Sequence, residues 1–134
     1  MKVVIDTNVI ISAALGSQTC SEVILIAIKN AQIIEPNIVS VELSRFCEKL
    51  ERKQQSDDKI KKIKNFFAVF LSFCVLKNPK KILNLSTDKP DNLFLSLSLE
   101  ENAVYVTGDK NALAFAKENK IKATSPVDFM KKNN

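Results

Sequence analysis

Four acidic residues stand where a folded α/β chain could bring carboxylates together: Asp6, Glu42, Asp91 and Asp109. Asp6 directly follows an apolar run at residues 3–5, and Asp109 comes just after a second run at residues 103–107. Burying an unpaired carboxylate is costly. We therefore expect both acids at the carboxyl ends of buried strands, where open α/β sheets bind ligands. A simpler interpretation is that Asp6 only caps the helix that follows it.

The side chains that are absent restrict the chemistry. The chain has no histidine, which excludes Ser-His-Asp and Cys-His mechanisms and disfavours a zinc site. Its cysteines, Cys20, Cys47 and Cys74, form no Cys-x-x-Cys pair and are predicted to be free, buried thiols. Catalysis must then come from carboxylates, hydroxyls, lysines or a metal.

Carboxylates that gather at one point repel each other, so such a cluster either shares protons or holds a cation. A site built from oxygen atoms suits a hard ion, Mg²⁺ or Mn²⁺. Such ions commonly act on phosphate groups. A basic protein with this site would be a phosphodiesterase that acts on nucleic acid.

Length and composition indicate one domain over residues 1–134, with 46% hydrophobic and 26% charged residues. No apolar run reaches the length of a membrane span, and Asp6 interrupts any signal-peptide pattern, so we expect a cytoplasmic protein without a membrane partner. The net charge of +5 is compatible with RNA or DNA as a partner, and equally with a solvated surface. The lysines that crowd residues 59–64 are interpreted first as a solvated helix face.

Apolar periodicity predicts alternating strands and helices. Strands are expected at 3–5, 33–35, 73–76, 103–107 and 121–123. Helices are expected at 12–30 (starting at Thr19 or Ser21), 38–53, 56–71, 90–101 and 110–119, and a last turn of helix from Pro126. This alternation predicts a three-layer α/β/α sandwich around a central parallel sheet.

Residues 86–101 give conflicting signals. Leucines at every second position from Leu93 to Leu99 have the period of a strand. Asp88 in a capping-box position and Pro90 in the first turn are instead typical of a helix start. A crossover is also needed before the strand at 103–107, and we therefore predict a helix from Pro90 to Glu101.

The predicted topology brings the four acids to one edge. Parallel strands place Asp6 and Asp109 at the same end of the sheet. The helix that begins near Asp91 runs antiparallel to the next strand, so its start reaches that edge too. Glu42, in the second turn of its helix, could also reach it, although an ion pair with Arg45 is the simpler interpretation.

These segments resemble the PIN-domain nucleases, most closely the VapC-type toxins of toxin–antitoxin modules. The resemblance runs from residue 1 to about 130. It rests on Val-Val-Ile-Asp6-Thr-Asn-Val, Glu42-Leu-Ser-Arg, Asp88-Lys-Pro-Asp91-Asn-Leu-Phe and Val-Thr107-Gly-Asp109-Lys, in family order. It implies a PIN fold, an endoribonuclease that needs Mg²⁺ or Mn²⁺, an RNA substrate, a cognate antitoxin and a homodimer.

The resemblance also implies a role for each acid. Asp6 and Asp91 would be the main metal ligands, Glu42 would hold the metal or its waters, and Asp109 would bind it directly or through water. Asn8 and Thr107 would orient the acids by hydrogen bonds.

The sequence departs from the family pattern in the last motif. Many relatives carry Thr-x-Asn with an acid further on, whereas this chain has Thr-Gly-Asp, which leaves the geometry at Asp109 open. Asp88 is interpreted as a helix cap, and Asp57 and Asp58 as acids of a helix start.

Two further hypotheses stay open beside the nuclease. The fold could serve as a non-catalytic module that binds RNA or protein. A phospho-acceptor regulatory domain also gathers acids and a metal at a sheet edge. That class expects an early acidic pair and a mid-chain acceptor aspartate, and Asp6 stands alone.

Overall fold

A parallel five-stranded sheet forms the centre of the computed structural model, which describes residues 1–134. The strands lie in the order β3-β2-β1-β4-β5, and every neighbouring pair is parallel. Their bounds are β1 Lys2–Ile5, β2 Gln32–Glu35, β3 Cys74–Leu76, β4 Val104–Val106 and β5 Ala123–Thr124. The predicted parallel α/β fold is confirmed.

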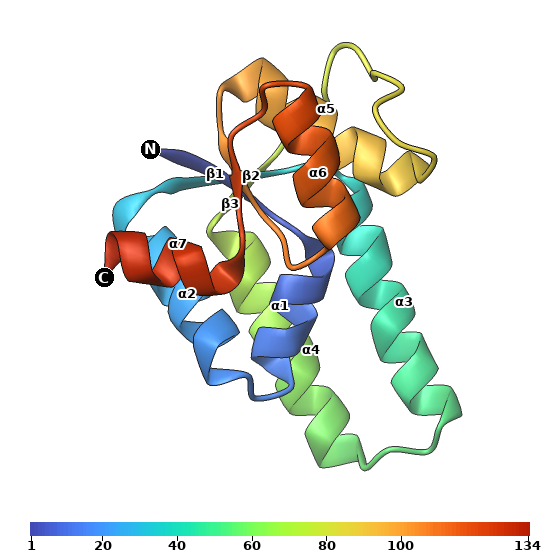
Figure 1. Ribbon diagram of the computed structural model, residues 1–134. Coiled ribbons are helices and arrows are strands. Elements are labelled where there is room, and N and C mark those ends of the chain that lie inside the picture. Colours follow the sequence, from blue (N-terminus) through green and yellow to red (C-terminus); the bar gives the residue numbers. More distant parts are fainter.

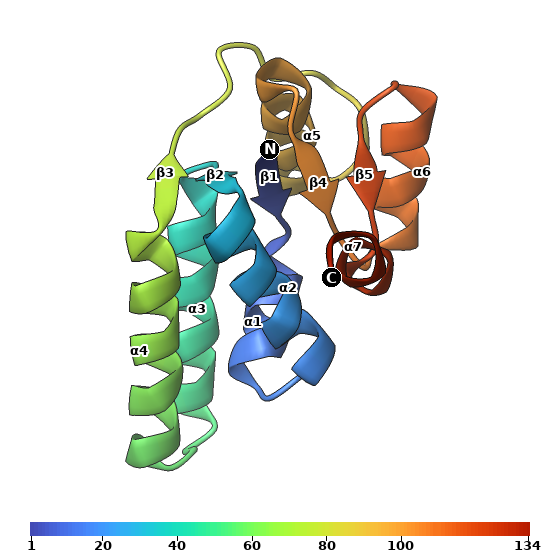
Figure 2. The same ribbon diagram turned by 90° about the vertical axis from the view of Figure 1, so that its left-hand side faces the viewer.

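Helices cover both sides of this sheet. α2 and α7 lie on one side, and α5 and α6 lie on the other (Figures 1 and 2). α3 and α4 form a long hairpin that extends beyond the sheet. The helices are α1 Thr7–Ala14, α2 Gln18–Asn30, α3 Ile38–Arg52, α4 Asp57–Ser72, α5 Lys89–Glu101, α6 Lys110–Glu118 and α7 Pro126–Asn133.

The central strand β1 explains why the sheet edge is polar. Val3, Val4 and Ile5 are fully buried, as a strand covered on both faces requires. Ile5 lies opposite Val106 of β4, and the Asp6 N–H donates to the Val106 carbonyl at 2.9 Å. Both strands therefore end together, and the polar residues that follow them meet at one edge.

The single helix expected over residues 12–30 is wrong. The structure has two helices, α1 and α2, which meet at a bend of 114°. Gly16 adopts a φ of +103°, a conformation that L side chains rarely adopt. Ser17, instead of Thr19 or Ser21, caps α2 by accepting from the Cys20 N–H. No single helix is long and apolar enough to span a membrane; only α1 and α2 taken together pass that test.

The helix predicted from Pro90 to Glu101 is confirmed as α5, and its burial explains the conflicting pattern. Residues 94–98 are all buried, including Ser96 and Ser98. A helix that is covered around most of its circumference has no polar stripe, so it loses the 3.6-residue period of a surface helix. Asp88 caps it as predicted, with its side chain accepting from the Asp91 N–H.

Candidate active site

Asp6 sits at the centre of the polar edge, directly after β1. Its Oδ2 accepts from the Thr107 hydroxyl at 2.7 Å, a contact between residues 101 positions apart. Its Oδ1 accepts from the Asn8 backbone N–H at 3.3 Å, so Asp6 also caps α1. Asn8 thus reaches Asp6 through its backbone, and its side chain makes no hydrogen bond. Burial is the main reason that the pKa of Asp6 is raised.

Glu42 is held toward the same edge by a residue that sequence analysis overlooked. The Thr7 hydroxyl donates to Glu42 Oε1 at 2.8 Å and so ties α3 to the start of α1. The ion pair with Arg45 considered above does not form. Burial raises the pKa of Glu42, and repulsion from Asp6 and Asp88 raises it further.

Of the four acids, Asp91 has the carboxylate with the fewest stabilising contacts. It lies in the first turn of α5, partly buried, and its side chain accepts no hydrogen bond from the chain. Burial, followed by repulsion from Asp88 and the other three acids, raises its pKa to about 6. A carboxylate in this position is stabilised by a proton or by a cation.

Asp109 follows Thr107 and caps α6. Its Oδ1 accepts from the N–H groups of Asn111 and Ala112 at 2.8 and 3.4 Å, and its Oδ2 makes no hydrogen bond. The Asp109 N–H donates to the Thr107 hydroxyl at 3.1 Å. In this chain's Thr-Gly-Asp motif, one carboxylate oxygen of Asp109 therefore caps α6 and the other is free.

The four acids are close enough to repel one another, but their side chains do not converge on one point. Mutual repulsion contributes to the raised pKa values of Asp6, Glu42 and Asp91. No lysine or arginine forms an ion pair with any of the four. No three acidic or cysteine side chains in this arrangement are placed to hold one metal ion. The donor atoms suit Mg²⁺, which is often bound by only one or two carboxylates and several waters.

A fifth acid, Glu35, lies behind this edge and was not singled out from the sequence. It ends β2, is fully buried, and both of its Oε atoms lie 3.3 Å from the Ile5 N–H that donates to them. Burial, with repulsion from Asp6 and Glu42, raises its pKa well above the usual range. The signal that identified Asp6, an acid at the end of an apolar strand, also applied to Glu35.

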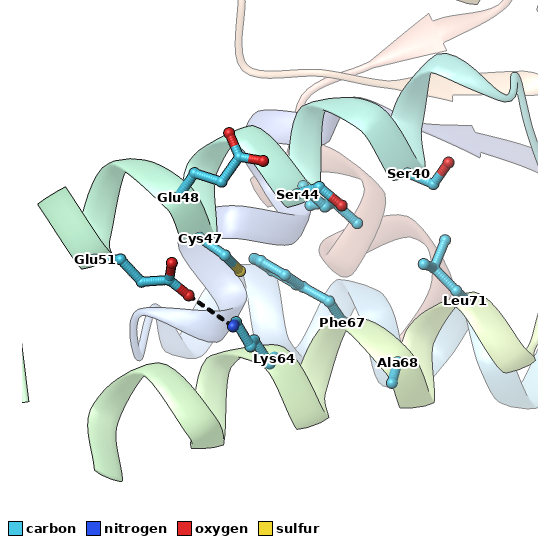
Figure 3. Close-up of a pocket in the computed structure, with 10 residues that line it drawn as sticks. Ser40, Ser44, Cys47, Glu48, Glu51, Lys64, Phe67, Ala68 and Leu71 are labelled. Carbon is cyan, nitrogen blue, oxygen red and sulfur yellow. Dashed lines mark hydrogen bonds and ion pairs between the residues drawn. The ribbon is translucent and has the colours of Figure 1, made fainter. Parts of the chain in front are cut away.

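Two surface hollows differ in the charged residues that line them. One, of about 380 Å³, is lined by Asp6, Asn8, Gly108 and Asp109 and opens beside the acids. A larger one, of about 480 Å³, lies between α3 and α4, where Phe67 forms part of its wall (Figure 3). Its Glu51 and Lys64 pair with each other at 2.7 Å. Only the smaller hollow is lined by two of the four acids, Asp6 and Asp109; Glu42 and Asp91 do not line it.

Comparison with known proteins agrees with this architecture. Residues 2–111 match the family model of the PIN domain. The uncharacterized protein MJ1680 of Methanocaldococcus jannaschii is 32% identical over an alignment of 143 positions. The alignment covers 97% of this chain and 90% of that protein.

Solved structures share the fold at low sequence identity. PAE2754 from Pyrobaculum aerophilum superposes with a TM-score of 0.71 at 18% identity, covering 98% of this chain and 97% of that one. VapBC2 from Rickettsia felis, bound to a DNA fragment from its promoter, gives 0.66 at 18% identity, covering 93% and 98%.

Proposed function

Since the chain belongs to the PIN-domain family, we propose that it is an endoribonuclease that needs Mg²⁺ or Mn²⁺ and hydrolyses phosphodiester bonds in RNA. The observation that carries the proposal is the Asp91 carboxylate. It has no hydrogen-bond donor and no ion-pair partner, and four other acids repel its charge. A divalent cation would remove that repulsion.

The acids differ in how they would hold the ion. Asp6 and Asp91 would be the main ligands, Glu42 would hold the ion or its waters, and Asp109 would bind it directly or through water. A bound divalent ion supplies Lewis acidity and lowers the pKa of a water that it holds.

Neighbouring hydroxyl and N–H groups orient two of these carboxylates by hydrogen bonds. Thr107 and the Asn8 N–H fix both oxygens of Asp6, and Thr7 fixes one oxygen of Glu42. Orientation by such bonds lowers the cost of assembling a site. The Asp91 carboxylate accepts no such bond, and its pKa of about 6 means that it is largely ionised above that pH.

The biological setting is part of the same proposal. The structural likeness to VapBC2 supports a role as the toxin of a toxin–antitoxin pair, with a cognate antitoxin as partner. We also propose that the protein forms homodimers and acts in the cytoplasm.

The experiment is cleavage of a mixed pool of structured and single-stranded RNA by purified protein. Reactions contain Mn²⁺, Mg²⁺ or chelator. Asp91→Asn is the test variant, and Asp58→Asn, which changes an exposed acid at the start of α4, is the matched control. We expect metal-dependent cleavage that Asp91→Asn loses and Asp58→Asn keeps.

Two results would contradict the proposal. Full cleavage in chelator would show that no divalent ion is needed. Tight RNA binding without turnover in either metal would favour the non-catalytic module.

A further inference from the structure

Tyr105 has the one buried side-chain polar atom in the chain that lacks a hydrogen-bond partner. It is the middle residue of β4 and is 0% exposed. Burying a hydroxyl without a partner costs on the order of 1–3 kcal/mol. An unpaired group that persists at such a cost calls for a functional explanation.

The packing of Tyr105 places its ring on the side of β4 that faces α5. Its ring stacks on Phe94 of α5, with centroids 5.9 Å apart and planes 24° apart. Phe94 lies three residues after Asp91, so the two share one side of α5. Thr107, two residues after Tyr105, shares its side of β4 and donates to Asp6. The ring of Tyr105 therefore lies against the side of α5 that carries Asp91.

Electrostatics agree with that placement. Burial, and then the charges of Asp6 and Asp91, raise the pKa of Tyr105 far above its ordinary value. The Thr107 hydroxyl is near enough to oppose this shift, but the two hydroxyls do not meet hydrogen-bond geometry. Thr107 already donates to Asp6 and accepts from the Asp109 N–H.

β4 thus carries an unpaired donor, and α5, the helix that the Tyr105 ring contacts, carries an unpaired acceptor. Both oxygens of Asp6 already accept hydrogen bonds, whereas neither oxygen of Asp91 does. We propose that Tyr105 is a positioning residue of the carboxylate site, whose hydroxyl donates to Asp91, directly or through one water, when a divalent cation is bound. This inference rests on the metal-dependent function proposed above.

The first test uses metal affinity. Mn²⁺ binding is measured by calorimetry for wild type, for Tyr105→Phe, which keeps the ring, and for Ser98→Ala. Ser98 is a matched control, because its buried hydroxyl on α5 is already satisfied by the Phe94 carbonyl at 2.8 Å. We expect Tyr105→Phe to weaken binding roughly 10-fold, as loss of one hydrogen bond to a charged group does. Ser98→Ala should not change it.

Thermal unfolding in chelator separates this role from a structural one. Without metal, Tyr105→Phe should be at least as stable as wild type, because it removes an unsatisfied buried hydroxyl. A melting temperature well below that of wild type would show that the hydroxyl is needed for folding and would overturn the proposal.

The second test needs no substitution. Tyr105 is the only tyrosine and the chain has no tryptophan, so tyrosine fluorescence reports on this side chain alone. Mg²⁺ should change the emission with the same midpoint as its binding. Unchanged emission at saturating Mg²⁺, or Mn²⁺ binding by Tyr105→Phe within 2-fold of wild type, would overturn the inference alone. If wild type binds neither ion, the proposed function itself fails and the inference fails with it.

Discussion

At the scale of single residues, the buried carboxyl of Glu35 differs from the four acids in front of it. Asp6, Glu42, Asp91 and Asp109 are at least partly exposed to solvent, whereas Glu35, at the end of the neighbouring strand β2, is fully buried and forms no ion pair. Its raised pKa favours the neutral form, which accepts the Ile5 N–H at little electrostatic cost. We interpret it as a support for the last residue of β1, directly before Asp6.

We therefore predict opposite effects for two substitutions. Glu35→Gln keeps an acceptor for Ile5 and should leave the free energy of unfolding unchanged or raised. Glu35→Ala opens a cavity and leaves that N–H unpaired, which should cost about 2–4 kcal/mol. Urea unfolding measures both, with Glu48→Gln, an exposed acid of α3, as the control.

The pH dependence gives a further check on Glu35. A raised folded-state pKa means that the stability contributed by this carboxyl is lost as pH rises through that pKa. The advantage of Glu35→Gln over wild type should thus grow with pH. An equal loss of stability in the Gln and Ala variants would contradict this account.

At the scale of elements, three helices begin at the carboxylate edge. Asp6 caps α1, Asp88 caps α5 and Asp109 caps α6. The positive ends of helix dipoles favour negative charge at these points. Capping also orients each carboxylate by one or two backbone hydrogen bonds, so the same residues cap the helices and bring negative charge to this edge.

Asp88 allows capping and charge to be separated. Asp88→Asn keeps a good cap and removes a charge that repels Asp91, so it should lower the pKa of Asp91 from about 6. Asp88→Ala loses the cap as well, which should cost about 1 kcal/mol of stability. Carboxyl titration by NMR and urea unfolding, both without metal, distinguish the two effects.

The sign of the pH effect follows from the raised pKa of Asp91. In the metal-free protein its contribution to stability is full below about 4, its unfolded value, and is lost as pH rises through about 6. In Asp88→Asn that loss should be smaller and should be complete at a lower pH. Identical stability–pH profiles for Asp88→Asn and wild type would contradict the predicted repulsion.

At the scale of the whole molecule, positive charge lies both near the acids and far from them. Lys89 and Lys110 begin α5 and α6, next to Asp88 and Asp109. The lysines at 59–64 lie in the first half of α4, toward the far end of the α3–α4 hairpin (Figure 1). An RNA strand held at the acids would meet the first group.

We predict that the double variant of Lys89→Gln and Lys110→Gln weakens RNA binding several-fold and reduces its salt dependence. The matched double variant of Lys61→Gln and Lys62→Gln removes the same charge and should change affinity less than 2-fold. Filter binding at two salt concentrations, with Asp91→Asn to prevent cleavage, measures this. A larger loss from the α4 pair would place the RNA along the hairpin.

Local patterns were enough to predict the parallel sheet, most helices and the strand-end acids. Val3 to Ile5 is apolar on both faces, which only a doubly covered strand tolerates, and Asp6 must then lie at its end. Asp88 and Pro90 identified the start of α5, although the burial of that helix obscured its period. These features depend on neighbours in the chain, so the sequence shows them.

Contacts between distant residues could not be predicted in the same way. Thr107 meets Asp6 across 101 positions, Thr7 meets Glu42 across 35, and Glu35 meets Ile5 across 30. Each depends on strand register, or on the angle at which helices leave the sheet, and neither is encoded in a local pattern. The bend at Gly16 and the unpaired hydroxyl of Tyr105 likewise appear only after the elements pack, because packing decides which backbone turns and which polar groups are left without partners.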